Sequence, residues 1–101
     1  MALLDRACRN LESALKAAHL TMRDVAKLTI YVVGYSHDCA ETFAATLSHY
    51  FADRARPALS LVGVQTLARP EFLVEIEALA IGGLRVRLTQ HDPFTSLRAR
   101  P

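Results

Sequence analysis

Tryptophan is absent from this 101-residue chain, and glycine, proline and cysteine are scarce, with four, four and two copies. So few glycines and prolines exclude collagen-like and low-complexity chains, and two cysteines cannot build the disulfide framework of a small secreted domain. No apolar run approaches the roughly 20 residues of a membrane span. Residues 1–6 also lack the basic-then-apolar layout of a secretion signal. We therefore expect a cytosolic (cytoplasmic) protein with reduced thiols and no membrane partner.

Charge is similarly limited, with a formal net charge of +2 at pH 7. A charge this small does not by itself indicate nucleic-acid binding, and no aromatic-plus-basic platform of the kind that binds single strands is evident. Hydrophobic residues make up 51% of the chain, which is enough to build a core at this length. We expect a single domain without a nucleic-acid partner.

Hydrophobic periodicity predicts the elements. Three- and four-residue spacing predicts helices over residues 4–18 and 40–51, and alternation or β-branched enrichment predicts strands over residues 25–33, 58–65 and 72–81. A further short strand is possible over residues 84–88, and residues 91–101, with two prolines and scattered arginines, are expected to form a mobile tail. The order helix, strand, helix, strand, strand predicts an α+β sandwich with the helices on one face of the sheet.

The strand at residues 72–81 has two unlike faces. One is small and apolar: Val74, Ile76, Ala78 and Ala80. The other mixes carboxylates with large aliphatic side chains: Leu73, Glu75, Glu77, Leu79 and Ile81. Carboxylates among aliphatic side chains are costly unless each finds a donor or water. The second face is therefore expected to line an interface or a cleft, although a solvated face with scattered leucines remains an alternative.

Three sequence blocks carry a resemblance to a known family. They are Asn10-Leu11-Glu12 to Ala17-Ala18 with Thr21 to Val25, Tyr50-Phe51 leading into Arg56-Pro57-Ala58, and Leu67-Ala68-Arg69-Pro70 closing on Val74-Glu75-Ile76-Glu77-Ala78. In order and spacing they resemble the RidA (YjgF/L-PSP) family of reactive-intermediate, or enamine/imine, deaminases. The resemblance divides the chain into a RidA-like domain over residues 1–83 and a C-terminal extension over residues 84–101.

The resemblance implies a chorismate-mutase-like (bacillus-type) fold, in which two helices pack on one face of a mixed sheet. It also implies a homotrimer with small-molecule clefts between subunits, and we expect Leu59, Leu61, Leu73 and Leu79 near those contacts. Active members are hydrolases that convert 2-aminoacrylate-type enamines and imines to 2-keto acids and ammonia. In them an arginine binds the substrate carboxylate bidentately and a glutamate positions the attacking water.

Two departures from the family pattern bear on activity. The family motif Pro-Ala-Arg-Ser/Thr here reads Pro57-Ala58-Leu59-Ser60, so Leu59 occupies the arginine position. Glu75 matches the water-positioning glutamate and is the candidate catalytic residue, while Leu59, Ser60 and Arg56 are the candidate substrate-binding positions. Arg56 is also an ordinary basic residue at a helix end. In addition, the N-terminal β-hairpin with which family members begin has no counterpart, so the domain is expected to be incomplete at its N-terminus.

The remaining polar residues suggest no other chemistry. His37, Cys39 and Glu41 lie close together, but no second ligand pair stands at metal-binding spacing, so no metal or cofactor is predicted. Three functional classes stay open: a deaminase with altered preference, a non-catalytic trimer that binds a small metabolite, and an interaction piece. Because leucine cannot pair with a carboxylate, we expect little hydrolysis of the usual substrates.

Overall fold

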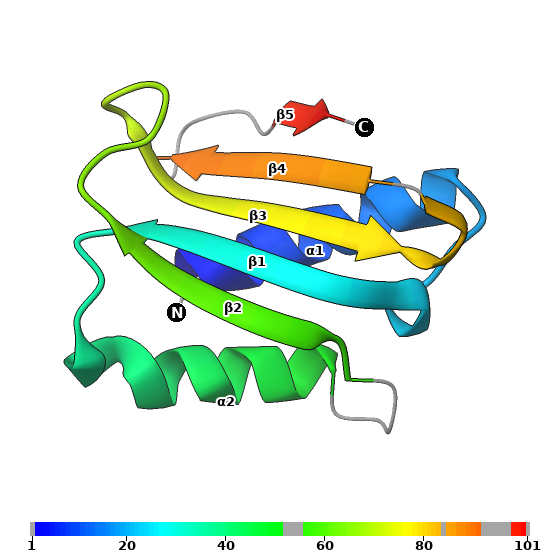
Figure 1. Ribbon diagram of the computed structural model, residues 1–101, viewed down its shortest axis with the longest axis horizontal. Helices are drawn as coiled ribbons and strands as arrows, with labels where there is room; N and C mark the ends of the chain where they lie inside the picture. The colour runs from blue at the N-terminus through cyan, green and yellow to red at the C-terminus, as the bar shows by residue number, and fades with distance from the viewer. Residues whose placement is uncertain (1, 52–55, 84, 92–97, 101) are drawn as a thin grey trace.

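In the computed structural model, which describes residues 2–51, 56–83, 85–91 and 98–100, a mixed sheet is covered on one face by two α-helices (Figure 1). The strands are β1 (Val25–Val33), β2 (Ala58–Val64), β3 (Phe72–Ala80), β4 (Arg85–His91) and β5 (Arg98–Arg100), and the helices are α1 (Ala2–Ala17) and α2 (Ala40–Tyr50). The strand order is β2-β1-β3-β4-β5, with β1 and β2 parallel and the other pairs antiparallel. A parallel pair needs a crossover connection, which α2 provides. The predicted α+β fold is confirmed.

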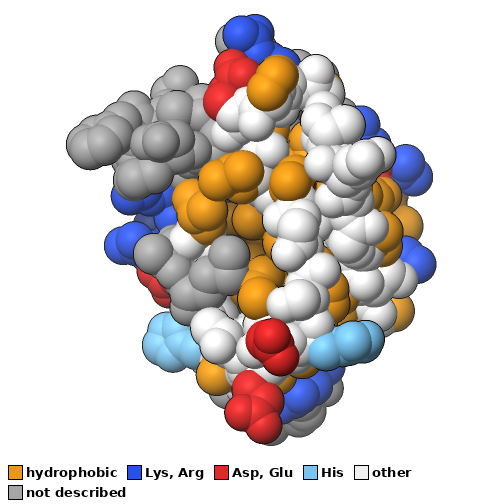
Figure 2. Space-filling model, turned by 90° about the vertical axis from the view of Figure 1, so that its left-hand side faces the viewer, with side chains coloured by type: hydrophobic (Ala, Val, Ile, Leu, Met, Phe, Trp, Pro, Cys, Tyr) orange, Lys and Arg blue, Asp and Glu red, His pale blue; other side chains and the backbone are white. Residues whose placement is uncertain are grey.

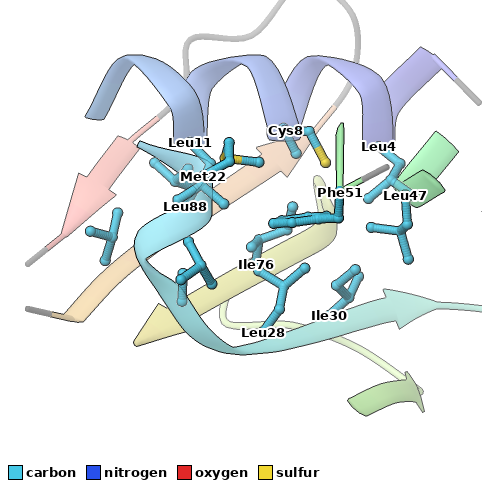
Figure 3. Packing of buried hydrophobic residues seen from close by; sticks show 14 of the residues in the cluster. Leu4, Cys8, Leu11, Met22, Leu28, Ile30, Leu47, Phe51, Ile76 and Leu88 are labelled. Atoms are coloured by element: carbon cyan, nitrogen blue, oxygen red, sulfur yellow. The ribbon is translucent and has the colours of Figure 1, made fainter. Parts of the chain in front are cut away.

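The core lies between the sheet and the helices, and Figure 3 shows Leu4, Cys8 and Leu11 of α1 above Leu28, Ile30, Ile76 and Leu88 of the sheet. All seven of these side chains are buried. On β3 the buried residues are Phe72, Val74, Ile76, Ala78 and Ala80. The alternation predicted for this strand is therefore confirmed, and its carboxylates lie on the opposite face of the sheet.

The C-terminal segment differs from the prediction. β4 extends to His91 and pairs along β3, and β5 pairs with β4. Val86 and Leu88 are only 6% and 1% exposed and belong to the same core as α1. The alternation of these two apolar residues with arginines makes β4 one-sided, and the short strand that was possible over residues 84–88 is present from Arg85 and runs on to His91. Residues 92–97 and 101 of the expected mobile tail lie outside the described part of the chain.

Local hydrogen bonds fix the turn between α1 and β1. The Leu20 amide donates to the Leu15 carbonyl over 2.8 Å and the His19 amide to the Lys16 carbonyl over 2.9 Å, which is the Schellman arrangement. His19 takes the left-handed conformation, φ 62°, that glycine usually occupies there. A capping box follows, in which the Thr21 amide donates to Asp24 Oδ2 over 2.8 Å. The box leads into a single 3₁₀ turn, Met22–Asp24, directly before β1.

Candidate functional site

One face of the sheet is left uncovered by both helices, and its side chains stand in rows because paired residues of neighbouring strands point to the same side. We call this the open face. Three rows run across the strands. The first includes Lys27 of β1, Leu79 of β3 and Arg85 of β4. The second includes Ser60, Thr29, Glu77 and Arg87, and the third includes Val62, Tyr31 and Glu75. Leu73 shares the open face with Glu75, because it lies two residues before it on β3. The candidate catalytic residue Glu75 and the candidate binding residue Ser60 therefore share one face.

The centre of the open face is an ion-pair network around Arg87. Its guanidinium Nη2 donates to Oε2 of Glu77, and its Nε lies 3.7 Å from Oε2 of Glu75. Both carboxylate side chains are largely shielded, with exposed fractions of 17% for Glu75 and 19% for Glu77. The hydrogen bond to Glu77 and its negative charge raise the pKa of Arg87. The donor that two carboxylates on an aliphatic face require is thus supplied by β4.

Arg87 also keeps unused hydrogen-bonding capacity. Its Nε is buried and has no hydrogen-bond partner among the described residues, since the 3.7 Å to Glu75 exceeds hydrogen-bonding distance. A buried donor without a partner is costly. A small shift of Glu75, or a ligand oxygen between the two groups, would satisfy it.

The sequence-based prediction missed both arginines of β4. Arg85 and Arg87 were not named as candidate site residues, whereas they stand on the open face beside Leu79 and Glu77. The signal that could have located them is the alternation Arg85-Val86-Arg87-Leu88, which has the period of a strand with one buried face.

A hollow of about 220 Å³ opens beside this network, and we call it the Lys27–Arg85 hollow. It is lined by Lys27, Thr29, Glu77, Leu79 and Arg85. Nη1 of Arg85 lies 3.9 Å from Oε2 of Glu77, at the limit of an ion pair, and the Arg85 side chain is 61% exposed. Within the described residues, the cations of this hollow outnumber its single carboxylate.

The other two candidate binding residues lie on the opposite side of the sheet. Leu59 is paired with the buried Leu28 and therefore faces the helices, although it is 50% exposed because β2 is an edge strand. Arg56 and Leu59 line a second hollow, of about 230 Å³, with residues of α2. Its other lining residues are Leu28, Ala44, Leu47, Ser48, Phe51 and Pro57. We call it the Leu59 hollow.

The four leucines expected near subunit contacts or clefts divide between the two sides of the sheet. Of these, Leu59 and Leu61 lie on the helix-covered side of the sheet, whereas Leu73 and Leu79 lie on the open face. Within one chain, the position of the family arginine and Glu75 are separated by the sheet.

Apolar surface remains exposed near both faces. Val62 and Leu73 on the open face are each 37% exposed. Hydrophobic side chains also gather in the middle of the end of the molecule seen in Figure 2, with charged side chains toward its margins. Surface of this kind is typical of regions that contact a partner or a ligand.

Other kinds of site find little support in the described part of the chain. No three His, Cys, Asp or Glu side chains there are grouped so that they could hold a metal ion. Burial, together with smaller effects of the nearby Asp5 and Glu12, raises the pKa of the Cys8 thiol to about 12, so Cys8 is an unreactive core residue. None of the described helices is both long and apolar enough to cross a bilayer.

Comparison with known proteins places this geometry in a family. The family model described as Endoribonuclease L-PSP matches residues 3–82. That range holds the open-face residues of β1, β2 and β3 and ends before β4. No curated protein sequence matches the chain.

Several solved structures resemble the chain. A protein of unknown function of the conserved Rid protein family, YyfB from Yersinia pestis, is 38% identical with a TM-score of 0.66, and the match covers 70% of this chain and 53% of that one. A member of the highly conserved YjgF/YER057c/UK114 family from Mycobacterium tuberculosis is 35% identical with a TM-score of 0.63, over 73% of this chain and 60% of that one. The chain thus spans little more than half the length of these relatives.

Proposed function

The chain belongs to the RidA (YjgF/L-PSP) family, and on that basis we propose that its open face binds small imine or enamine metabolites and the 2-keto acids formed from them. The observation that carries the proposal is the position of Glu75. Its shielded carboxylate stands on an uncovered sheet face, 3.7 Å from the guanidinium of Arg87. A carboxylate oriented by a cation beside apolar surface suits a site that holds a polar ligand and a water molecule.

We further propose that the complete site is formed between copies of the chain. Position 59 and Glu75 lie on opposite faces of one sheet, so a single subunit cannot direct both at one ligand. A homotrimer in which the β2 edge of one subunit meets the open face of the next would bring them together. The exposed Val62 and Leu73 would be covered by the same contact, which supports this arrangement.

The reaction available to such a site is hydrolysis of a carbon–nitrogen double bond. Glu75 would accept a proton from water while the water oxygen bonds to the imine carbon, and would then donate that proton to the imine nitrogen. The resulting carbinolamine then loses its nitrogen as ammonia and leaves a 2-keto acid, so that one water is consumed for each ammonia released. In active relatives the substrate carboxylate is held by an arginine, which Leu59 cannot replace.

We therefore expect binding to be retained and hydrolysis to be weak. Loss of a charge-assisted bidentate contact lowers transition-state stabilisation by roughly 10²-fold or more. The ligand would still contact Glu75 and the cations of β4, which are unaffected by the change at position 59. The protein would then act mainly as a binding protein for these metabolites.

The test measures the release of 2-keto acid from imines that an amino-acid oxidase generates in situ, in the same reaction mixture. The parent protein should add little to the spontaneous rate, and Leu59→Arg should raise it. Glu75→Gln in the Leu59→Arg background should abolish the gain, because the amide cannot accept the proton. No gain from Leu59→Arg, or a gain that survives Glu75→Gln, would contradict the proposal.

RNA cleavage, which the name of the matching family model denotes, is not what we propose for this chain. The open face carries two carboxylates in its centre, and the net charge of the whole chain is only +2. Phosphate contacts supply most of the affinity of proteins for nucleic acid, and a face with acidic residues at its centre opposes them. The charge pattern favours a small ligand.

A further inference from the structure

The charges around the Lys27–Arg85 hollow do not balance. Its one carboxylate, Glu77, already accepts a hydrogen bond from Arg87, and Arg85 is only at the 3.9 Å limit of an ion pair with it. Lys27 makes no ion pair with any residue that the structure describes. Among the described residues, Lys27, Arg85 and Arg87 together face only Glu75 and Glu77, so these five side chains of the open face carry one excess positive charge, which a monoanion would compensate.

We propose that the Lys27–Arg85 hollow is the anchoring site for a small carboxylate, with Arg85 as the residue that determines specificity for the anion. The inference rests on the proposed function for the class of ligand only, because Glu77 and not Glu75 is the carboxylate that lines the hollow. Arg85 and Lys27 approach the hollow from β4 and β1, on either side of Leu79. A carboxylate between the two cations would have its apolar substituent against Leu79.

The dimensions of the hollow suit a ligand of a few atoms. Its volume of about 220 Å³ corresponds to roughly seven water molecules at about 30 Å³ each. A short-chain 2-keto acid fits this space. Thr29, whose side chain can donate or accept, lies at the same wall and offers a partner for a keto or imine group.

The anchor comes from a strand outside the region shared with the family. The family match ends at residue 82, and Arg85 follows it. The position of Arg85 is fixed by its neighbour Val86, which is buried in the core, and by the pairing of Arg85 with Leu79. The strand that places Val86 in the core therefore also fixes a cation on the open face, on the same side of the sheet as Glu75.

The test is a calorimetric titration of the full chain with sodium pyruvate at constant ionic strength. Arg85→Gln should weaken binding about tenfold or more, because a charge-assisted contact becomes a neutral one. Arg85→Lys should keep most of the affinity. The matched control is Arg69→Gln, which removes the same charge from an exposed arginine paired with Glu71 in the loop between β2 and β3 and should bind like the parent.

Two further readouts separate the possible results. Pyruvamide, which is neutral and of similar shape, should bind more weakly than pyruvate. Lys27→Gln is a second variant in case Arg85→Gln fails to fold, and it should also weaken pyruvate binding. Equal affinity of the parent and Arg85→Gln, equal affinity for pyruvate and pyruvamide, or no binding to the parent would overturn the inference.

The inference and the proposed function can fail separately. Pyruvate binding that does not depend on Arg85, together with a Glu75-dependent gain of hydrolysis in Leu59→Arg, would overturn the inference and leave the proposed function standing. Arg85-dependent pyruvate binding without any such gain would uphold the inference and contradict the site proposed around Glu75.

Discussion

Substitution of Leu88 by alanine should destabilise the protein strongly, although Leu88 lies in the C-terminal extension beyond the predicted RidA-like domain. Leu88 is 1% exposed and lies in the core beneath α1 (Figure 3). It is paired with Ile76, which is completely buried. Truncation would remove buried methyl groups and leave a cavity that the two-layer packing can close only in part.

The expected cost follows from burial. Leu→Ala at a fully buried site lowers the free energy of unfolding by about 2–5 kcal/mol, because a cavity term adds to the transfer term. Leu59 provides a matched control, because it is the same residue type on another strand of the sheet but is 50% exposed. Because Leu59 is half exposed, it gains only about half of the free energy of burying a leucine side chain, and its removal leaves no closed cavity. Leu59→Ala should therefore lower the free energy of unfolding by roughly 1 kcal/mol or less.

Urea unfolding followed by circular dichroism measures both values. The midpoint should fall far more for Leu88→Ala than for Leu59→Ala, and the slope with urea should stay unchanged, since the slope reports the surface exposed on unfolding. Equal costs for the two variants, or a cost below about 1 kcal/mol for Leu88→Ala, would mean that β4 does not belong to the core.

Two further predictions concern titration and a helix–helix contact. The folded state keeps the Cys8 thiol neutral up to a pKa of about 12 against 9.0 for the free group, so the stability it contributes is complete below pH 9 and is lost as pH rises toward 12. Urea unfolding at several pH values should show a fall of up to about 1.4 kcal/mol per pH unit that is reduced in Cys8→Ala; an identical slope in both would contradict this. Tyr50→Phe removes the hydrogen bond, 2.7 Å long and partly exposed, that the Tyr50 hydroxyl donates to Asp5 Oδ1. Thermal unfolding should show a loss of about 1 kcal/mol in the free energy of unfolding. Tyr35→Phe is the control and should be nearly neutral. A cost no greater than that of the control would refute it.

The elements that periodicity predicted well are those with one strongly apolar face. On β3 the alternation alone identified which residues are buried, and the structure agrees at Val74, Ile76 and Ala78. On β2 both faces carry small or apolar residues in similar number, so alternation separated the two faces but gave no means of deciding which one meets the helices. The pairing with Leu28 decides it, and such pairing depends on tertiary structure.

The candidate site was predicted only in part for a related reason. Glu75 and Glu77 were located as carboxylates that need a donor, but their partner Arg87 lies ten residues beyond Glu77 and after a turn. A short strand was possible over residues 84–88, but nothing in the sequence indicated that its arginines lie beside the carboxylates of β3. Which cation reaches a carboxylate across a sheet is set by strand register, and register follows from the packing of the buried face.

The proposed site needs Glu75 from one copy and position 59 from another, so the molar mass in solution is the most direct test. Light scattering on the full chain at micromolar concentration should give three times the chain mass of 11.2 kDa. Circular dichroism on the same sample confirms that the protein is folded. A folded species of 11.2 kDa would contradict a site shared between subunits.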